Sequence, residues 1–265
     1  MVEKAVVKVT RRNFINTGLK ALTVGAALVS GGGFILKTSN PVQAATDSNS
    51  WTTKWQNHKW KFVVDTKKCI GCGKCVQACK IENDVPLDSE VYRTWVERYR
   101  IGADEKVLVD SPEGGIHSFP KDPADAKYNK AFFVPKLCNQ CANSPCVKVC
   151  PVGATYKTED GVILVDRKRC IGCGYCIQSC PYGARYLHPK LKVADKCTWC
   201  YQRITKGMKP ACVQACPAGA RLFDDVKAPD NQISKILDEE RVGVLKEAMG
   251  TDPQVFYVGL DKVVK

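Results

Sequence analysis

The cysteines constrain this chain more than any other feature, because all sixteen fall into four groups of four. The groups are Cys69, Cys72, Cys75, Cys79; Cys138, Cys141, Cys146, Cys150; Cys170, Cys173, Cys176, Cys180; and Cys197, Cys200, Cys212, Cys216. Every group opens with C-x2-C and closes with C-x3-C, and only the spacing between these two pairs differs. The chain therefore contains an internal repeat that is built around metal-ligating side chains.

Three kinds of chemistry use thiols at such spacing. Disulfide frameworks are typical of short secreted chains without a sizeable core, whereas this chain has 265 residues, of which 45% are hydrophobic. Structural zinc sites usually combine two C-x2-C pairs across a longer loop and do not use a third cysteine three positions on. A 4Fe-4S cluster fits best, because three close thiolates bind three corners of the cubane and a fourth, which precedes a proline, binds the other cluster of a pair.

The residues between and after the cysteines favour the same interpretation. Glycines separate the first cysteines of the first and third groups: Gly71, Gly73, Gly172 and Gly174. They permit positive φ angles and a close approach of the backbone, so that amide N–H groups can point at cluster sulfur. The last three groups are followed by P-V-G-A-T, P-Y-G-A-R and P-A-G-A-R, in which proline disfavours helix and glycine permits a turn. The first group departs from this pattern, since Lys80 follows Cys79.

The four groups, with the stretches CNQCANSPCVKVCPVGATY and CTWCYQRITKGMKPACVQACPAGAR, resemble the four-cluster electron-transfer subunit of the dimethyl sulfoxide reductase family of molybdenum enzymes. Similar subunits accompany polysulfide, tetrathionate and arsenate reductases, formate dehydrogenases, some nickel-iron hydrogenases, and multihaem nitrite or sulfur complexes. The resemblance runs from about residue 65 to residue 223. It identifies the type of subunit specifically, but it gives only weak information about the partner protein.

The ligand pairing is implied by this resemblance, because the spacing alone suits more than one pairing. In proteins of this type the second group pairs with the third, and the first with the fourth. Carried over to this sequence, the nested arrangement gives sets 1 to 4 in this order: Cys69, Cys72, Cys75 with Cys216; Cys197, Cys200, Cys212 with Cys79; Cys138, Cys141, Cys146 with Cys180; and Cys170, Cys173, Cys176 with Cys150. Some relatives lack the second cysteine of the third group and hold a 3Fe-4S cluster. Cys173 is present here, so we expect four 4Fe-4S clusters.

The resemblance also implies an α+β architecture of tandem, nested bacterial-ferredoxin-like folds. The expected segments are a signal peptide at 1–44 and a four-cluster domain at 45–265, in which 69–80 with 190–223 holds one cluster pair, 136–188 holds the second, 81–135 is a β-rich insertion and 224–265 is a C-terminal extension. In and after the insertion, TWVERYRI, KVLVD, AFFVPKL and GVILVDR predict strands. Residues 45–60 are polar apart from tryptophans that pack on a partner or in the core.

In the C-terminal extension, the periodicity of apolar residues predicts a helix near 231–249 and VFYVG predicts a strand. The apolar face of the expected helix consists of Ile233, Ile236, Leu237 and Leu245. Neither element supplies a cysteine. The extension is therefore expected to add structure to the ferredoxin-like core without adding a ligand.

The amino terminus predicts export. TRRNFIN at 10–16 is a twin-arginine pattern, followed by an apolar run from Ala21 to Leu36 and by Val42-Gln43-Ala44, which suits signal peptidase. A membrane anchor is the alternative, but the run is shorter than the ~20 apolar residues of a membrane span and contains four glycines. We therefore expect cleavage after Ala44 and a periplasmic protein at the outer face of the cytoplasmic membrane.

The basic charge does not indicate nucleic acid. The chain carries a net charge of +13, of which residues 1–44 contribute +5 through six basic residues and Glu3, so +8 remains for residues 45–265. Each oxidised cubane with four thiolates carries about −2, so four clusters contribute roughly −8. The holoprotein is thus expected to be close to neutral, and its basic side chains to compensate the clusters.

No catalytic constellation is recognisable, since the histidines His58, His117 and His188 are scattered along the chain. We predict a non-catalytic subunit of anaerobic respiration that relays single electrons between a catalytic oxidoreductase subunit of molybdopterin, hydrogenase or multihaem type and a polytopic membrane quinone-handling subunit or cytochrome. Its membrane association would be peripheral, through these partners. The alternatives are a stand-alone soluble polyferredoxin carrier and a zinc-binding interaction module.

Overall fold

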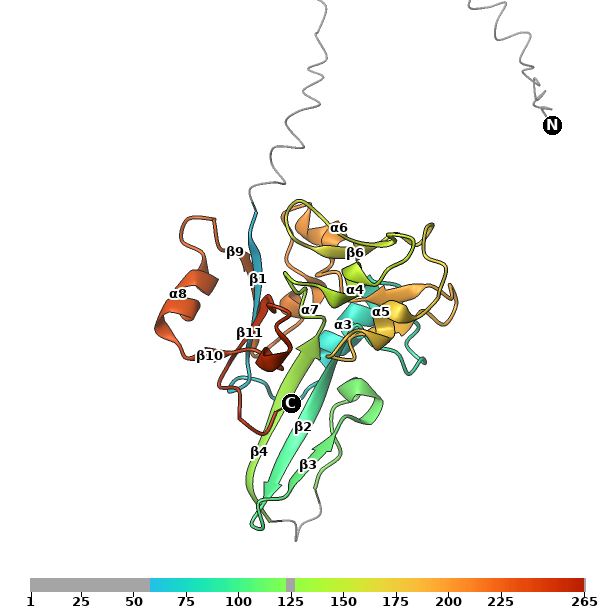
Figure 1. Ribbon diagram of the computed structural model, residues 1–265. Coiled ribbons are helices and arrows are strands. Elements are labelled where there is room, and N and C mark those ends of the chain that lie inside the picture. The colour runs from blue at the N-terminus through green and yellow to red at the C-terminus, as the bar shows by residue number, and fades with distance from the viewer. Residues whose placement is uncertain (1–57, 123–126, 265) are drawn as a thin grey trace, which may run out of the picture. The chain divides into compact units, whose positions relative to one another are not determined.

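The computed structural model describes residues 58–122 and 127–264, so the predicted signal segment lies outside the described residues. The strands are β1 (Trp60–Asp65), β2 (Thr94–Gly102), β3 (Val107–Asp110), β4 (Tyr128–Leu137), β5 (Thr155–Lys157), β6 (Ile163–Val165), β7 (Arg185–Leu187), β8 (Ala194–Lys196), β9 (Arg221–Asp225), β10 (Val242–Gly243) and β11 (Val255–Val258). The helices are α3 (Lys74–Glu82), α4 (Pro145–Lys148), α5 (Tyr175–Gln178), α6 (Tyr201–Ile204), α7 (Ala211–Gln214) and α8 (Gln232–Glu239), with short 3-10 turns η1 (Pro112–Gly115) and η2 (Glu247–Met249). None of the helices in these ranges is long and apolar enough to cross a bilayer. The mixture of short helices and small sheets confirms the α+β class (Figure 1).

Each cysteine group contains a short helix that ends close to the last cysteine of the group. In the last three groups this cysteine is followed by proline, which has no N–H to continue a helix, and α4, α5 and α7 each have only four residues. Lys80 replaces the proline in the first group, and α3 continues to Glu82. The departure seen in the sequence therefore lengthens one helix.

After each of the three prolines, the chain turns at a glycine and enters a strand. The glycines of the three C-P-x-G-A turns have nearly identical φ angles of 61°, 62° and 61°, in the left-handed region that favours glycine. Strands β5, β7 and β9 all begin at the fifth residue after the last cysteine of their group. The sequence repeat is thus a repeat of helix, turn and strand.

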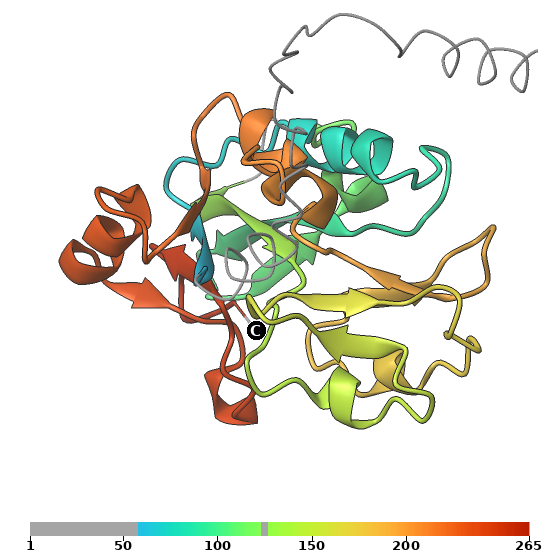
Figure 2. The ribbon, with the colours of Figure 1, turned by 90° about the horizontal axis from the view of Figure 1, so that it is seen from above.

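The strands pair in two ways. β5 pairs with β6 and β7 with β8 in separate antiparallel two-stranded sheets. β9 instead pairs antiparallel with β1, with Arg221 opposite Val64, while β11 lies parallel on the other side of β1. With β10 the order of this sheet is β10-β11-β1-β9, and Figure 2 shows β11 (red) beside β1 (blue). The strand predicted from VFYVG is confirmed as β11, whereas β1 was not predicted from the sequence.

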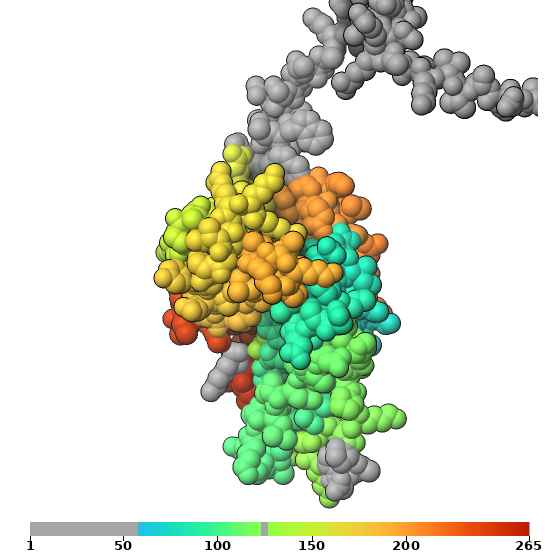
Figure 3. Space-filling model, turned by 90° about the vertical axis from the view of Figure 1, so that its right-hand side faces the viewer, coloured from blue at the N-terminus to red at the C-terminus, as the bar shows by residue number. Residues whose placement is uncertain are grey.

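The three strands predicted in the insertion are confirmed as the antiparallel sheet β3-β2-β4. We call residues 94–137 the arm; β2 and β4 pair along their length, from Thr94 opposite Leu137 to Gly102 opposite Tyr128. Figures 1 and 3 show the arm in green, extending away from the cysteine-rich part of the chain. Arg98 crosses from β2 to Asp110 at the end of β3 with a 2.7 Å ion pair, which fixes the outer strand.

The side chains of β1 alternate between two hydrophobic clusters. Phe62 and Val64 belong to the main core, which also contains Trp199, Tyr257 and cysteines of the repeat. Val63 points to the other face of the sheet, where it packs with Ile233 of α8. Since these residues are fully buried, β1 joins the cysteine-rich core to the C-terminal segment.

The helix predicted near 231–249 is correct at its start and wrong at its end. Asn231 caps α8, because its side chain accepts a 2.7 Å hydrogen bond from the amide of Ser234. The helix ends at Glu239, since Val242 and Gly243 pair with β11 as β10. Three of the predicted apolar positions, Ile233, Ile236 and Leu237, pack in the cluster with Val63 of β1 and Val258 of β11, whereas Leu245 lies beyond the helix in the main core.

We predict that Gly73→Ala destabilises the protein much more than Gly174→Ala. Both glycines precede a helix at equivalent positions of their groups and have positive φ angles of 70° and 79°. Alanine at either position therefore costs about 1–2 kcal/mol for the left-handed conformation. At Gly73 the added Cβ would also overlap the carbonyl oxygen of Gly115 in the arm, whereas at Gly174 it would meet nothing within 4 Å. Thermal unfolding of the two variants measures the difference, and equal melting temperatures would contradict the prediction.

Candidate metal centres

The cysteines of set 1 line one cavity. Cys69, Cys72 and Cys75 come from the loop before α3 and its first turn, and Cys216 comes from the turn between α7 and β9. Helices α3 and α7 pack against each other, which brings the first and fourth groups together. The other lining residues are mostly apolar, apart from Arg221.

The cysteines of set 3 line a second cavity of the same kind. Cys138, Cys141 and Cys146 lie between β4 and the end of α4, and Cys180 lies in the turn before β7. Helix α4 contacts α5, so the second and third groups meet here. Arg185 lines this cavity as Arg221 lines the first.

The cysteines of set 2 are all buried, and they interact with one another. Burial raises the pKa of Cys79, and the thiolates of Cys197, Cys212 and Cys200 raise it further. The amide group of Asn83 donates hydrogen bonds to two of these sulfurs, at 3.6 Å to Cys79 Sγ and 3.7 Å to Cys200 Sγ. The structure therefore brings the last cysteine of the first group to the fourth group.

The cysteines of set 4 lie in or near two neighbouring helices, α4 and α5. Cys150 follows α4, and Cys176 lies within α5, which contacts α4. Cys170 accepts a 3.3 Å hydrogen bond from the amide of Ala194, and Cys173 is exposed. Ligation by these four thiols stays a prediction.

The C-P-x-G-A turns surround the last cysteine with backbone amides. The amide of Thr155 donates to Cys150 Sγ at 3.4 Å, and the amide of Ala220 donates to Cys216 Sγ at 3.3 Å. Burial alone would raise the pKa of Cys150, yet the amides of Thr155, Val152 and Ala154 hold it below its usual value. The turn therefore stabilises the thiolate, which is the form that binds metal.

Several of the thiols are difficult to ionise without a cationic partner. Burial and neighbouring thiolates raise the pKa of Cys69 to about 11, and those of Cys141 and Cys197 to about 12. Four such thiolates are stable together only around a cationic core. Within residues 58–122 and 127–264, no three His, Cys, Asp or Glu side chains converge closely enough to hold a single metal ion. Thiols arranged around a cavity suit a cluster, whose inorganic core separates its ligands.

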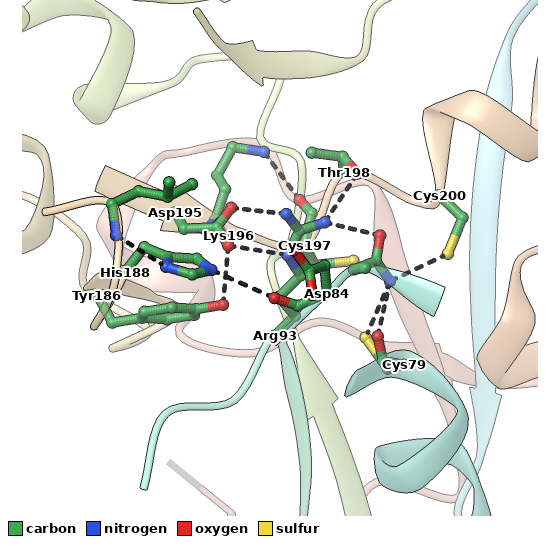
Figure 4. Close-up of polar contacts among 12 residues, drawn as sticks. Cys79, Asp84, Arg93, Tyr186, His188, Asp195, Lys196, Cys197, Thr198 and Cys200 are labelled. Atoms are coloured by element: carbon green, nitrogen blue, oxygen red, sulfur yellow. Dashed lines mark hydrogen bonds and ion pairs between the residues drawn. The ribbon is translucent and has the colours of Figure 1, made fainter. Parts of the chain in front are cut away.

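A buried polar network orients Asn83 toward the sulfurs of set 2. Figure 4 shows Arg93, Asp195 and Tyr186 of this network near Cys79 and Cys200. Arg93 donates to Asn83 Oδ1 at 2.8 Å, so the amide nitrogen of Asn83 faces the cysteines. Arg93 is held in turn by both carboxylate oxygens of Asp195, at 3.1 and 2.8 Å, and the hydroxyl of Tyr186 donates to Asp195 at 2.9 Å. Sequence reasoning missed Asn83 and Arg93, because neither lies in a cysteine motif and only the fold brings Asp195 to them.

Two further side chains connect sets 2 and 3. Gln140, between two cysteines of the second group, donates to the carbonyl of Cys197 at 2.8 Å and accepts from the amide of Ile163 at 2.8 Å. The fully buried Lys196 also donates to the carbonyls of Ile163 and Cys197. Burial lowers the pKa of Lys196, and the nearby thiolates of Cys138 and Cys197 oppose that shift. These contacts fix the second group against the fourth.

The three histidines lie at separate places. His58 is 2.6 Å from Asp225, the exposed His117 is 3.4 Å from Glu113, and the buried ring of His188 accepts amide hydrogen bonds at 3.3 Å. None of them lines either cysteine cavity.

Repeated helix, turn and strand units that bury cysteines around apolar cavities define a ferredoxin-like iron-sulfur protein. The comparison with protein families agrees, since models of the 4Fe-4S dicluster domain match residues 68–154 and 129–226. Two such domains hold four 4Fe-4S clusters, which accounts for all sixteen cysteines.

The similar proteins define the family. The sequence is 37% identical over 254 residues to the B subunit of tetrathionate reductase from Salmonella typhimurium, covering 95% of this protein and 89% of the relative. It is 41% identical over 225 residues to the B subunit of tetrathionate reductase from Archaeoglobus fulgidus (84% and 94% covered), and 37% identical over 203 residues to the B component of polysulfide reductase from Wolinella succinogenes (76% and 94% covered). The protein belongs to this family of iron-sulfur electron-transfer subunits, which confirms the resemblance drawn from its cysteine groups.

Proposed function

We propose that the protein relays single electrons between a catalytic reductase subunit and a membrane quinone-handling subunit or cytochrome. The observation that carries this proposal is that cysteines from all four groups lie in or against one hydrophobic core, among them Cys75, Cys138, Cys180 and Cys197. A bound 4Fe-4S cluster accepts and releases one electron at a time. The core contains cysteines of sets 1, 2 and 3, whereas Cys173 of set 4 is exposed. Amides and buried cations of the protein set the potentials of the clusters.

The relatives favour a partner that reduces a sulfur compound, since their names refer to tetrathionate and polysulfide reductases. The part of the chain that the structure describes offers no group of His, Cys, Asp or Glu side chains that could hold a single catalytic metal ion. We therefore assign substrate chemistry to the partner and electron transfer to this chain.

The relay predicts a division of activities. The full chain, purified without air, should accept electrons from dithionite and pass them to an artificial acceptor, yet reduce neither tetrathionate nor polysulfide. Addition of the catalytic and membrane partners should restore quinol-linked reduction. Substrate reduction by the isolated chain at the rate of the complex would overturn the proposal, and failure to assemble with any partner would favour a stand-alone carrier.

We further propose that sets 1 to 4 are the ligand sets. Support comes from Cys216, which shares a cavity with the first group, from Cys180, which shares one with the second group, and from Cys79, which interacts with the fourth. In each case the last cysteine of a group lies with the first three of another. The same crossing assigns Cys150 to the third group.

Under this assignment, Cys150→Ser should alter the cluster bound by Cys170, Cys173 and Cys176. Electron paramagnetic resonance gives the readout, with Cys173→Ser and Cys141→Ser as reference variants for sets 4 and 3. The Cys150→Ser spectrum should lose the signal that Cys173→Ser loses. If it loses the signal that Cys141→Ser loses instead, each group binds its own cluster and the nested sets are wrong.

Export by the twin-arginine route, and hence a periplasmic location at the membrane, is part of the proposal. It rests on TRRNFIN at 10–16 and on the cofactor, because this route carries folded proteins. Exchange of Arg11 and Arg12 for lysine should leave the precursor in the cytoplasm, as measured by cell fractionation. Lys20→Arg, outside the motif, is the matched control, and normal export of the double variant would refute this route.

A further inference from the structure

Two arginines occupy equivalent positions in the repeat. Arg185 and Arg221 are the fifth residues after Cys180 and Cys216, at the ends of the C-P-Y-G-A-R and C-P-A-G-A-R turns. Each is the first residue of the strand that leaves its turn. In the second group the same position is occupied by Thr155. Each of the two proposed cluster pairs therefore has one arginine at this point of the fold: Arg221 for sets 1 and 2, and Arg185 for sets 3 and 4.

Both guanidinium groups are buried without a carboxylate partner. Arg185 is 4% exposed and Arg221 is 2% exposed. Arg185 donates to Thr155 Oγ1 at 3.2 Å and to Cys146 Sγ at 3.1 Å, and Arg221 donates to Thr94 Oγ1 at 2.8 Å. Among the residues that the structure describes, no Asp or Glu forms an ion pair with either, and Nη1 of Arg221 has no hydrogen-bond partner.

A third buried arginine, Arg93, has the carboxylate partner that Arg185 and Arg221 lack. Arg93 has Asp195 as a bidentate partner at 2.8 and 3.1 Å, which neutralises its charge locally. Arginine stays protonated in proteins, so Arg185 and Arg221 place two full positive charges in the interior. A buried charge without a counterion is strongly destabilising. Anions must therefore face both guanidinium groups in the functional protein.

The thiolates of the cysteine sets are those anions. Burial lowers the pKa of Arg221, but the thiolates of Cys75, Cys212 and Cys69 more than compensate and raise it. Cys69 and Cys75 belong to set 1, whereas Cys212 belongs to set 2. The side chain of Arg221 lines the cavity of set 1, and helix α7, which contains Cys212, contacts β9, so that Arg221 lies beside set 2 as well.

Arg185 occupies the equivalent position beside sets 3 and 4. Burial lowers its pKa, and the thiolates of Cys146, Cys138 and Cys176 raise it above its usual value. The first two belong to set 3 and Cys176 belongs to set 4. The side chain lines the cavity of set 3 and contacts Cys146 Sγ directly.

We propose that Arg185 and Arg221 are equivalent internal counterions, each placed between the two clusters of one pair, where they raise the reduction potentials of both. The inference rests on the proposed function and its ligand sets. One electron changes the charge of a cubane with its four thiolates from about −2 to −3. A fixed positive charge stabilises the more negative state, and a guanidinium group does so without taking up a proton.

The test compares three variants of the full chain, purified without air, by redox titration followed with electron paramagnetic resonance. Arg185→Gln keeps a hydrogen-bond donor and removes the charge, whereas Arg185→Lys keeps the charge. Arg169→Gln is the matched control, because Arg169 also lies beside a cysteine but is 70% exposed, so solvent screens its charge. Iron and acid-labile sulfide are counted for every preparation.

We expect Arg185→Gln to shift two of the four midpoint potentials to more negative values, with the larger shift for set 3, which the side chain contacts. The potentials of sets 1 and 2 should stay unchanged, and Arg221→Gln should give the reciprocal result. Arg185→Lys should retain most of the wild-type potentials, and Arg169→Gln should retain all of them. Four unchanged potentials in a fully loaded Arg185→Gln protein would overturn the proposal.

Loss of clusters would also be decisive. If Arg185→Gln binds less iron, Arg185→Lys should restore the iron content, since the positive charge compensates the thiolates. An equal loss in both variants would show that the shape of arginine matters instead of its charge, and would overturn the proposal. A wild-type protein without four reducible clusters would contradict the proposed function itself, so the two failures are distinguishable.

Discussion

Buried thiolates that lie close together are the constraint on which this structure depends. Burial and mutual repulsion both oppose the ionised form, as the raised pKa values of Cys69, Cys141 and Cys197 show. Cations and oriented N–H donors in the same interior stabilise the thiolates. They are the backbone amides in the turns, Asn83 beside set 2, and the guanidinium groups of Arg185 and Arg221. Iron would complete this balance, which is why cofactor insertion and folding are coupled in such a chain.

The unit of helix, turn and strand recurs in three of the four groups, and departures from it give the groups different roles. A proline after the last cysteine ends the helix in three groups, while Lys80 lets α3 continue toward Asn83. Arginine at the first position of β7 and β9 lines a cavity, whereas Thr155 at that position of β5 accepts a hydrogen bond from Arg185. Single substitutions within the repeat therefore distinguish sites that share one backbone.

Hydrogen bonds in the interior join the part of the chain that holds sets 1 and 2 to the part that holds sets 3 and 4. Gln140 and Lys196 bind the carbonyl of Cys197 from opposite sides of the boundary between sets 2 and 3. The C-terminal segment adds β11 to β1, the strand that leads into the first cysteine group. The electron path that we propose thus crosses a boundary fixed by hydrogen bonds, in a core from which water is largely excluded.

The sequence by itself determined the cofactor, the family and five of the eleven strands in the described residues, because cysteine spacing and alternating apolar residues are local patterns. It predicted β2, β3, β4, β6 and β11 correctly, and the start of α8. It did not determine where α8 ends, since pairing of Val242 and Gly243 with β11 overrides the helical periodicity. Nor did it identify Asn83, Arg93, Arg185 or Arg221 as partners of the thiols. Their roles depend on which distant cysteines share a cavity and on which buried charges lack a carboxylate, and both are decided only when the tertiary structure brings the four groups together.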